Sequence, residues 1–591
     1  MKRLFLCFFS MMISFAYAWA QDTIIVALDQ PGTLEDVLGQ ISKSAKYETA
    51  SLKVQGPIDG TDMMFIRDMC GVTNLNTKTQ GILSALDLGD AYIMESQEPY
   101  ISVYGIDFTT HIDEFGPFFL YNCANLTQLI LPESIEVIDT MAFAGCVNLT
   151  EIELPGTLRS IGYGAFVNCN SLKEIHVPDA VTELGVGAFQ RMEALETLSL
   201  GNGLTEIENS LIVEDNSLRI INLGMRIHSF NPVVFYNTPS LMEVNADEYN
   251  PFFTSIDGVL YSKETDTLVV YPASYPQEQF EIPLGVKMLA PYSFYGSNML
   301  QTVTLPESLI TIDSLAFFGC ENLAEVRGGK ALSTIRFGAF GVSPGNGASL
   351  MSLQLPATVS LIEGGAFFCN PNLQVKVDND NPYYVTSDDG VLYNHDLTRL
   401  CYVPALTESF EFPITLETIG EYAFAGVMNL PEIQVPDQVT TLCDEAFAFA
   451  AGTSTIVLGP NVSKVGAQVI DYCESLTDLY LFADDIPDDN LHPYSFLDES
   501  GMALEQCVLH VKPGLATHYM VKKGFYSEEY ETFFFANIAE IENPDGIGNV
   551  EFKSQKTKYY GIDGRIRKSP LRGLNIIKLP TGNTLKMINS H

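Results

Sequence analysis

A motif of 23 residues recurs along most of this chain and limits the folds that it can adopt. Its first clear copy begins at Leu126 and reads L-x-x-L-x-L-P-x-x-I-x-x-I-x-x-x-A-F-x-x-C, and the next begins at Leu149 in the same phase. The chain has 591 residues, whereas single hydrophobic cores stop growing at about 250 to 300 residues. The repeat therefore predicts an elongated array rather than one compact core.

Each copy supplies two short extended segments, a proline corner and a small residue followed by an aromatic one. No copy can bury its apolar side alone, so copies must stack and share a continuous core. We expect a β-rich solenoid of about thirteen turns, with short parallel strands about 4.7 to 4.9 Å apart and the aromatic rings inside. The clearest pairs are Ala142-Phe143, Ala165-Phe166, Ala188-Phe189, Ala316-Phe317, Ala339-Phe340, Ala366-Phe367, Ala423-Phe424 and Ala446-Phe447.

Two insertions with a shared template interrupt the array, near residues 247–281 and 378–411. Both begin with Asn-Pro and two aromatic residues, and both continue to Asp-Gly-Val-Leu-Tyr, at 257–261 and 389–393. Asp-Gly between apolar segments favours tight turns, so we expect small β elaborations at the edge of the solenoid. Their aromatic side chains either contact a ligand or only pack the joint; these residues are Phe252, Phe253, Tyr383 and Tyr384.

The two ends of the chain do not follow the repeat. Residues 1–20 have Lys2 and Arg3, an apolar run and an A-x-A site, which is typical of a signal peptide. Residues 21–111 are expected to be a small α/β cap, because the first turn of a solenoid would otherwise expose its core. Within this cap we predict a helix with Thr33 as N-cap, a strand at 52–54, a turn at 59–60, a helix at 62–69 and a strand at 86–88. The array proper then spans 112–541.

This repeat, L-x-x-L-x-L-P-x-x-I-x-x-I-x-x-x-A-F-x-x-C, resembles the leucine-rich repeats of the BspA-like family. That family is found in secreted and surface proteins of Bacteroidetes-type bacteria. The resemblance implies a right-handed leucine-rich repeat solenoid and frequent roles in adhesion to host proteins or other cells. After a linker at 542–550, residues 551–591 resemble the C-terminal sorting tails of Bacteroidetes secreted proteins. That tail has Asn575 where the family pattern has Tyr. Together these features imply an exported protein at the outer cell surface or beyond it.

Charge excludes one class of partner. The formal net charge is −41, and the segment 551–591 is basic, with nine Lys or Arg against two Asp or Glu. The rest of the chain is therefore strongly acidic and would repel phosphate backbones, which argues against nucleic acid as a partner. No stretch after residue 20 has 18 uninterrupted apolar residues, so we expect no transmembrane segment.

The sequence offers little catalytic chemistry. Of ten cysteines after residue 20, five share one phase of the repeat: Cys123, Cys146, Cys169, Cys320 and Cys473. That periodicity favours a buried packing column, and export leaves disulfides as the alternative. None forms C-x-x-C, and H-E-x-x-H, G-x-S-x-G and P-loop motifs do not occur. The acidic run at 484–489 lacks EF-hand spacing. We therefore predict no enzyme, no cofactor and no metal site.

The candidate binding surface is the face of the strands that points away from the core. In L-x-x-L-x-L the residue between the last two leucines points outward, because strand side chains alternate. This column contains Ile130, Glu153, His176, Ser199, Asn222, Asn245, Thr304, Arg327, Gln354, Gln434, Val457 and Tyr480. We expect ligand contacts at His176, Asn222, Arg327, Gln354 and Tyr480, with a merely solvated face as the alternative.

These features predict a non-catalytic binding protein that engages host or cell-surface proteins. A surface protein that captures glycans or nutrients is the first alternative, and it would use aromatic side chains gathered on one face. A structural spacer at the cell surface is the second.

Overall fold

A computed structural model describes residues 23–207, 211–212, 216–235, 238–492, 495–496, 506–519, 535 and 537–541. For 526–527, 532–533 and four strands between 559 and 589 it describes the backbone. The expected signal peptide and linker lie outside the described residues. The chain divides into two compact units, which we treat separately: unit 1 is Met1–Glu278 with Met288–Met299, and unit 2 is Gln279–Lys287 with Leu300–His591.

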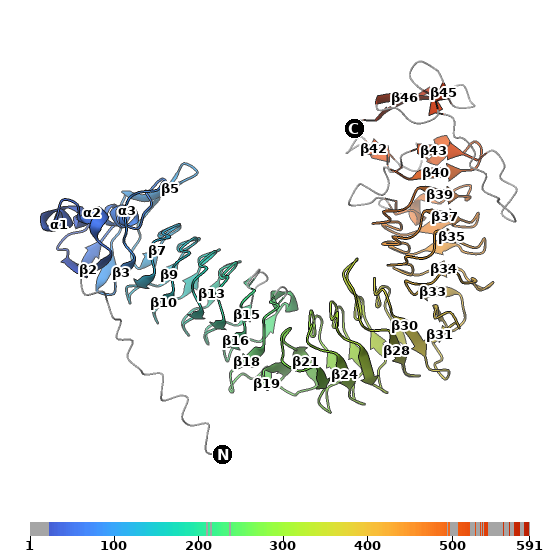
Figure 1. Ribbon diagram of the computed structural model, residues 1–591, viewed down its shortest axis with the longest axis horizontal. Coiled ribbons are helices and arrows are strands. Elements are labelled where there is room, and N and C mark those ends of the chain that lie inside the picture. Colours follow the sequence, from blue (N-terminus) through green and yellow to red (C-terminus); the bar gives the residue numbers. More distant parts are fainter. Residues whose placement is uncertain are drawn as a thin grey trace. The chain divides into compact units, whose positions relative to one another are not determined.

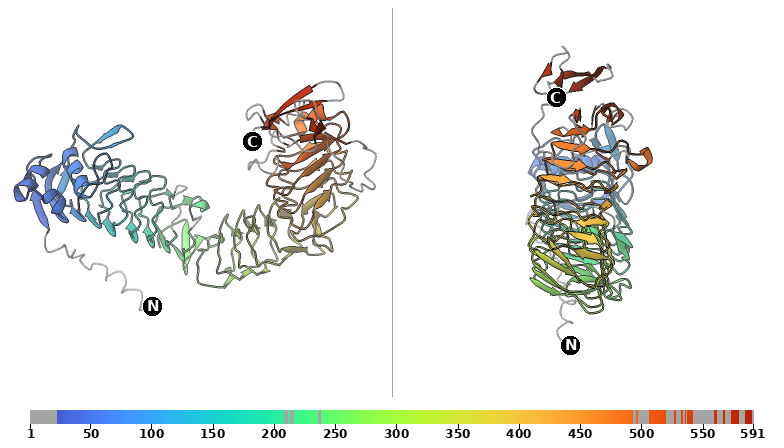
Figure 2. Two further views of the ribbon diagram at one scale, coloured as in Figure 1. Left: turned by 45° about the horizontal axis from the view of Figure 1, so that its top comes forward. Right: turned by 90° about the vertical axis from the view of Figure 1, so that its right-hand side faces the viewer.

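Both units are built from stacked turns of parallel strands, about 16 turns of roughly 23 residues in all (Figures 1 and 2). Most turns contribute one strand to a first row, and many also contribute a two-residue strand to a second row. Consecutive turns pair in exact phase, so that Ile152 of one turn lies beside Leu129 of the turn before. The predicted parallel β-solenoid is therefore confirmed.

In unit 1 the first row begins inside the N-terminal cap, before the repeat is recognisable. β2 pairs in parallel with β1 and β3, and β3 pairs with β8 of the first clear repeat. The first row contains β1 (Ile24–Ala27), β2 (Ser51–Ile58), β3 (Ala85–Asp87), β8 (Gln128–Ile130), β10 (Glu151–Glu153), β12 (Glu174–His176), β14 (Thr197–Ser199), β16 (Ile220–Leu223) and β18 (Glu243–Ala246). The second row contains β7 (Glu114–Phe115), β9 (Val137–Ile138), β11 (Ser160–Ile161), β13 (Glu183–Leu184), β15 (Glu206–Ile207) and β17 (Ser229–Phe230).

The cap adds helices and a hairpin to this row. They are α1 (Leu34–Ile41), α2 (Ala45–Glu48), α3 (Gly60–Met69), β4 (Ala91–Ile93) and the antiparallel pair β5 (Pro99–Val103) and β6 (Ile106–Thr109). Thr33 is the N-cap residue of α1, as predicted, but its hydroxyl makes no cap hydrogen bond and donates to the carbonyl of Gln30. Asp62 accepts hydrogen bonds from the backbone of Gly32 and Leu34 instead. The predicted turn at 59–60 is the start of α3, where Asp59 is the N-cap of a capping box.

Unit 2 carries the later turns. Its first row contains β22 (Gln279–Glu281), β24 (Thr302–Leu305), β26 (Glu325–Gly328), β28 (Ser352–Leu355), β30 (Gln374–Val377), β35 (Glu432–Gln434), β37 (Thr455–Leu458), β39 (Asp478–Leu481), β40 (Val508–Val511) and β43 (Asn537–Glu540). Its second row contains β25 (Thr311–Ile312), β27 (Thr334–Ile335), β29 (Leu361–Ile362), β34 (Thr418–Ile419), β36 (Thr441–Leu442) and β38 (Lys464–Val465). Short 3-10 turns lie at η1 (Pro232–Phe235), in unit 1, and η2 (Asp488–Asn490).

The expected count of about thirteen turns was too low for a physical reason. β2 and β3 at one end, and β40 and β43 at the other, extend the ladder through backbone hydrogen bonds. These bonds do not depend on side chains, so the ladder continues where the sequence motif has disappeared. Beyond it, the chain forms the antiparallel pairs β41 (Tyr526–Ser527) with β42 (Thr532–Phe533), β44 (Tyr559–Tyr560) with β45 (Ile566–Arg567), and β46 (Gly573–Lys578) with β47 (Thr584–Asn589).

Both insertions are β elaborations, as expected. In the first, β19 (Phe253–Ile256) and β20 (Val259–Ser262) form a hairpin through Asp257 and Gly258, both with positive φ. β20 then pairs with β21 (Thr267–Val270), which rejoins the second row through β23 (Met288–Leu289). In the second, β31 (Tyr384–Thr386), β32 (Leu392–Asn394) and β33 (Arg399–Tyr402) repeat this order and lead into β34.

The interior follows the motif. The phenylalanines of the small-aromatic pairs are buried and stack from turn to turn: Phe143 and Phe166 have ring centroids 5.0 Å apart, and Phe317 and Phe340 5.3 Å apart. Three cysteines of the shared phase donate to backbone carbonyls: Cys146 Sγ lies 3.2 Å from Leu120 O, Cys169 Sγ 3.2 Å from Phe143 O and Cys473 Sγ 3.0 Å from Phe447 O. All ten described cysteines are free thiols, so the structure agrees with the prediction that this column is buried packing rather than disulfides.

Candidate binding surface

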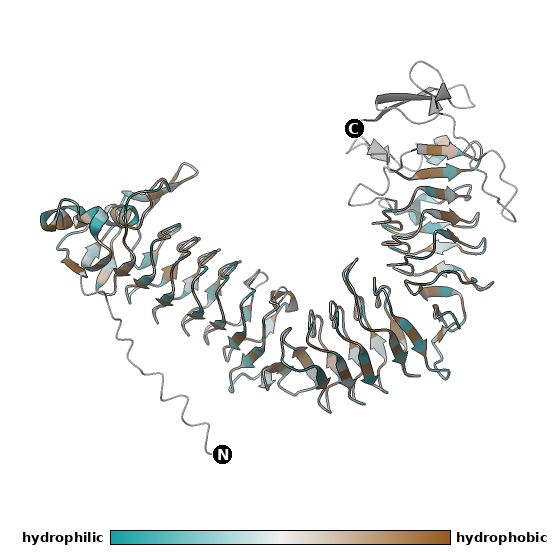
Figure 3. Ribbon diagram, viewed as in Figure 1, coloured by the Kyte–Doolittle hydropathy of each residue, from teal (hydrophilic) through white to brown (hydrophobic). Residues whose placement is uncertain are grey.

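The outward residues of the first-row strands form columns in strict register. In unit 1, His176 lies beside Ser199, which lies beside Asn222 and then Asn245. In unit 2, Gln434, Val457 and Tyr480 align in the same way. Hydrophilic and hydrophobic residues alternate along these strands, as Figure 3 shows. The sheet-face column expected from the sequence therefore exists within each unit.

Glutamates occupy the preceding outward position in several turns and pair with the candidate residues. His176 Nε2 lies 3.7 Å from Glu174 Oε2, and both side chains are about two-thirds exposed, at 66% and 61%. Arg327 donates two hydrogen bonds to Glu325, at 2.6 and 2.5 Å. Neither pair is buried, so each is held only weakly and can exchange its partner for a ligand group.

The Asn222 side chain is held more firmly than these pairs, by hydrogen bonds on both sides. Its amide donates to Ser199 Oγ at 2.9 Å, and its carbonyl oxygen accepts from the amide of Asn245 at 3.2 Å. Asn245 also donates to Glu243. These side chains form a ladder along three strands, which stabilises the sheet face and leaves Asn222 only half-exposed.

In unit 2, Gln354 is exposed on β28, and Tyr480 is half-buried on β39. Tyr480 stacks on His510 of the neighbouring strand β40, with ring centroids 4.2 Å apart. Phe482 follows on the same strand side, at a near-parallel 15° and 6.4 Å from Tyr480. Val457, expected to point outward as part of this column, is 9% exposed and adds little surface.

His510 was missed from the sequence because it lies beyond the recognisable repeat. Its Nε2 lies 2.7 Å from Asp478 Oδ1, and this hydrogen bond holds the pKa of Asp478 below its usual range. The aromatic residues of the sheet face therefore gather at β39 and β40, which no single motif indicated.

The insertion aromatics divide into two kinds. The first aromatic of each pair points outward, since Phe252 is 47% exposed and Tyr383 is 52% exposed. The second packs inward: Phe253 lies 5.4 Å from the ring of Phe230, and the Tyr384 hydroxyl accepts a hydrogen bond from the backbone of Ile362. Only the first of each pair is placed to meet a ligand.

Each insertion also has a hub, a buried asparagine whose side chain makes four hydrogen bonds: Asn250 in the first and Asn381 in the second. The amide nitrogen of Asn250 donates to the carbonyls of Gly224 and Ile227, and its oxygen accepts from the backbone of Phe252 and Phe253. Asn381 repeats this arrangement in the second insertion. In each insertion, two of the four hydrogen bonds join the asparagine to the turn before it, and the other two hold the aromatic residues that follow. The Asn-Pro-aromatic template was visible in the sequence, but this role was not.

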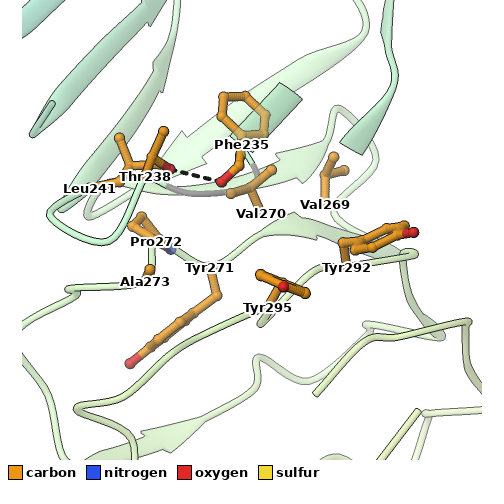
Figure 4. Close-up of a pocket in the computed structure, with 10 residues that line it drawn as sticks. All are labelled: Phe235, Thr238, Leu241, Val269, Val270, Tyr271, Pro272, Ala273, Tyr292 and Tyr295. Atoms are coloured by element: carbon orange, nitrogen blue, oxygen red, sulfur yellow. Dashed lines mark hydrogen bonds between the residues drawn. The ribbon is translucent and has the colours of Figure 1, made fainter. Parts of the chain in front are cut away.

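A small pocket lies beside the first insertion in unit 1, shown in Figure 4. Phe235, Tyr271, Tyr292 and Tyr295 contribute rings to it, and Thr238 donates a hydrogen bond of 2.8 Å to the Phe235 carbonyl. Its volume of about 20 Å³ holds roughly one water molecule. It is therefore too small for a ligand larger than water.

Within the residues that the structure describes, no three His, Cys, Asp or Glu side chains gather as a metal ion would require. Among those residues, none of the helices has the length and apolar character needed to cross a bilayer.

The repeat region decides the family. A profile described as the BspA type leucine-rich repeat region matches residues 113–242, 271–385 and 399–488, in six copies, which together exceed half of the chain. The chain belongs to the BspA-type leucine-rich repeat family. No curated relative matched the sequence.

Several solved structures of leucine-rich repeat proteins are similar. The pneumococcal vaccine antigen PcpA is 18% identical, over 70% of this chain and 80% of that one, with a TM-score of 0.33. A leucine-rich repeat protein from Bacteroides ovatus is 20% identical, over 63% and 76%, with a TM-score of 0.31. A leucine-rich cell surface protein from Faecalibacterium prausnitzii is 20% identical, over 64% and 85%, with a TM-score of 0.30.

Proposed function

We propose that this BspA-type protein is a non-catalytic binding protein that acts at the outer cell surface or beyond it and attaches to proteins of a host or of other cells. The observation that carries the proposal is the in-register sheet face. Stacked repeats create long, rigid surfaces of this kind, which solenoid proteins use to bind other proteins. The export signal read from residues 1–20 and the sorting-like tail support the location.

Exposed polar pairs on this face supply the chemistry. Glu174 with His176 and Glu325 with Arg327 present charged groups that are solvent-accessible and only locally paired. Such groups give specificity and fast association more than raw affinity. Gln354 and the Tyr480–His510 stack add a hydrogen-bonding group and an aromatic anchor in unit 2.

The test is a binding screen of the exported chain against host matrix proteins, in parallel with a glycan array. Protein binding should fall when Glu174 and His176 are replaced by alanine, and separately when Glu325 and Arg327 are. The double change Glu183→Ala with Thr182→Ala, at β13 of the second row of unit 1 and the residue before it, is the matched control and should leave binding intact. Retained binding in every sheet-face variant would overturn the proposal.

Glycan capture is the second candidate, and the outward rings of Phe252 and Tyr383 favour it. Sugar rings stack on exposed aromatic faces, so binding on the glycan array should then fall in Phe252→Ser and Tyr383→Ser but not in the sheet-face variants. A chain that binds neither class would be a spacer.

A further inference from the structure

The chain contains the dipeptide Asn-Gly twice, at Asn202-Gly203 in unit 1 and at Asn346-Gly347 in unit 2. In such a dipeptide the backbone nitrogen of the glycine can attack the side-chain carbonyl carbon of the asparagine. Glycine has no Cβ, so its backbone reaches conformations that other residues avoid. The reaction then depends on how firmly the fold holds the two residues, and the two copies differ in this respect.

Asn346-Gly347 lies in a loop that the repeat does not need. Leu149 follows Ala142 by seven positions, whereas Leu350 follows Ala339 by eleven, so this loop is four residues longer than the same part of the earlier turn. Extra residues at the tip of a loop pack little surface and are held by few contacts.

Only the middle of this loop is exposed. Val342 and Ala348 are buried at its two ends, while residues 344–347 are exposed. The backbone nitrogen of Asn346 donates to the carbonyl of Ser343 at 3.0 Å and closes a tight turn. The chain is therefore anchored on both sides of the dipeptide and open at the dipeptide itself.

The nitrogen of Gly347 is free to move. In the part of the chain that the structure describes, its N–H donates no hydrogen bond. A Cβ placed on Gly347 would meet no atom within 4 Å. Neither a hydrogen bond nor a neighbouring atom thus keeps this nitrogen away from the Asn346 side chain.

The side chain of Asn346 is held by one exposed hydrogen bond. Its amide nitrogen donates to Glu321 Oε1 at 2.9 Å, and this bond ties the loop to the preceding turn. Because the bond is solvent-exposed, water can replace either partner, and the bond restrains the amide only weakly. The carbonyl carbon of the Asn346 amide therefore remains open to attack.

The other copy of the dipeptide is enclosed. A Cβ on the buried Gly203 would lie 2.2 Å from Val181 O and 2.6 Å from Asp179 O. The Asn202 nitrogen donates to Asp179 Oδ1 at 2.9 Å, and Asn202 Oδ1 accepts from the nitrogen of Met225 at 2.8 Å. Neighbouring turns on both sides thus hold Asn202 and Gly203 in place.

We propose that Asn346 is a site of spontaneous deamidation in the folded protein, with water as the co-reactant. The Gly347 nitrogen forms a bond to Asn346 Cγ, and the bond between Cγ and Nδ2 breaks. The proton of the Gly347 N–H leaves with Nδ2, so ammonia departs and a five-membered succinimide ring remains. Water then adds to one of the two ring carbonyls and opens the ring, which gives aspartate or isoaspartate with an ionised carboxyl group.

The product changes the contact that ties the loop down. A carboxylate takes the place of the amide that donates to Glu321, so a hydrogen bond is replaced by two like charges that repel. Isoaspartate also adds one methylene group to the main chain. We expect the exposed part of the loop to loosen as the protein ages, while the buried ends at Val342 and Ala348 stay in place. This inference depends on neither the sheet face nor any ligand.

The test follows both dipeptides in the full chain, incubated at neutral pH in water labelled with heavy oxygen. Peptide mapping by mass spectrometry measures the conversion of each asparagine and the uptake of labelled oxygen. We expect Asn346 to convert at least about tenfold faster than Asn202, which corresponds to a difference of about 1.4 kcal/mol in the barrier. In concentrated urea the two should convert at similar rates, because only the fold distinguishes them.

Two glycine variants separate the reaction from general instability. Gly347→Ala places a methyl group beside the attacking nitrogen, at a position where a Cβ fits without contact, and should slow the conversion of Asn346 about tenfold. Gly156→Ala is the matched control, since a Cβ there also meets nothing within 4 Å, and should leave that rate unchanged. Unfolding temperatures show that both variants are folded.

The consequence for the loop is measured separately. Hydrogen exchange of amides 345–349 should be faster in Asn346→Asp than in the parent, and Glu321→Gln in the same chain should reduce the difference. Exchange at the parent rate in Asn346→Asp would contradict the loosening of the loop.

Equal conversion of Asn202 and Asn346 in the folded chain would overturn the proposed site. An Asn346 that stays intact in the folded chain and converts only in urea would overturn it as well, as would parent-rate conversion in Gly347→Ala. Loss of host-protein binding in the sheet-face variants bears only on the proposed function.

Discussion

The ring of Tyr480 lies parallel to the imidazole of His510, with centroids 4.2 Å apart and planes 10° apart. The two residues are register partners on β39 and β40. Asp478, two positions before Tyr480, fixes the imidazole through its hydrogen bond to Nε2. This arrangement ties the last clear repeat to a turn that lacks the motif.

We expect Asp478→Asn to destabilise unit 2 at neutral pH and not in acid. The hydrogen bond from His510 lowers the pKa of Asp478 in the folded state. Its stabilisation is therefore present above the unfolded pKa, about 3.9, and is lost as pH falls through the lower folded pKa. The Asp478 side chain is 37% exposed, so the cost at pH 7 should stay below about 1 kcal/mol.

Urea unfolding of parent and variant at pH 7 and at pH 2 to 3 measures this difference. Asp388→Asn is the control, because Asp388 is exposed on the second insertion. An Asp478→Asn effect of the same size at both pH values would contradict the assignment.

Removing the side-chain amide of Asn250 or Asn381 should lower the free energy of unfolding more than removing most other side chains of the two insertions. Each makes four hydrogen bonds while being 0% and 3% exposed. Alanine would leave buried backbone donors and acceptors unsatisfied, at a cost of about 2 to 4 kcal/mol. Asn429→Ala removes one exposed bond of 3.3 Å and should cost below about 0.5 kcal/mol.

Hydrogen exchange would show where the loss falls. Amides of 252–262 in Asn250→Ala should exchange faster than in the parent, while those of 431–458 should not change. Equal exchange rates of amides 252–262 in the parent and in Asn250→Ala would show that Asn250 does not hold the insertion.

The interior of this protein could be predicted because its residues must repeat. Phe143, Phe317 and Cys146 occupy phases that every turn needs, so a period in the sequence is enough to place them. The Asn250 hub could not be placed, because its partners Gly224 and Ile227 lie 26 and 23 residues earlier and contribute only backbone carbonyls. The position of His510 on the sheet face could not be predicted for a related reason, since backbone pairing continues where the side-chain periodicity ends.

The candidate site was less predictable than the scaffold. The alternation of side chains along a strand correctly placed His176 and Arg327 on the outer face. It does not tell whether an outward side chain is hydrogen-bonded to its neighbours. Asn222 is engaged in a ladder, whereas Gln354 is exposed.

The buried cysteine column should resist alkylation in the folded protein. Burial raises the pKa of Cys169 to about 12, so very little thiolate exists at pH 8. Iodoacetamide followed by mass spectrometry should label Cys443 first, because it is only half-buried, whereas burial raises the pKa of Cys401 to about 12 as well. All ten should react after unfolding in denaturant without reductant. Cysteines that react in denaturant only after reduction would show disulfides and contradict the packing assignment.

Phe317→Ala should destabilise unit 2 by about 3 to 5 kcal/mol, because it removes a buried ring and leaves a cavity in the interior column. The side chain is 2% exposed and stacks on Phe340 at 12°. Phe252→Ala is the matched control: its side chain is 47% exposed, and its removal should cost below about 1 kcal/mol. Each repeat contacts only its neighbours, so the damage should be local, and exchange should quicken first in the turns on either side of 317. Urea unfolding followed by hydrogen exchange tests both points. A Phe317→Ala protein with parent stability would mean that the interior column is not continuous there.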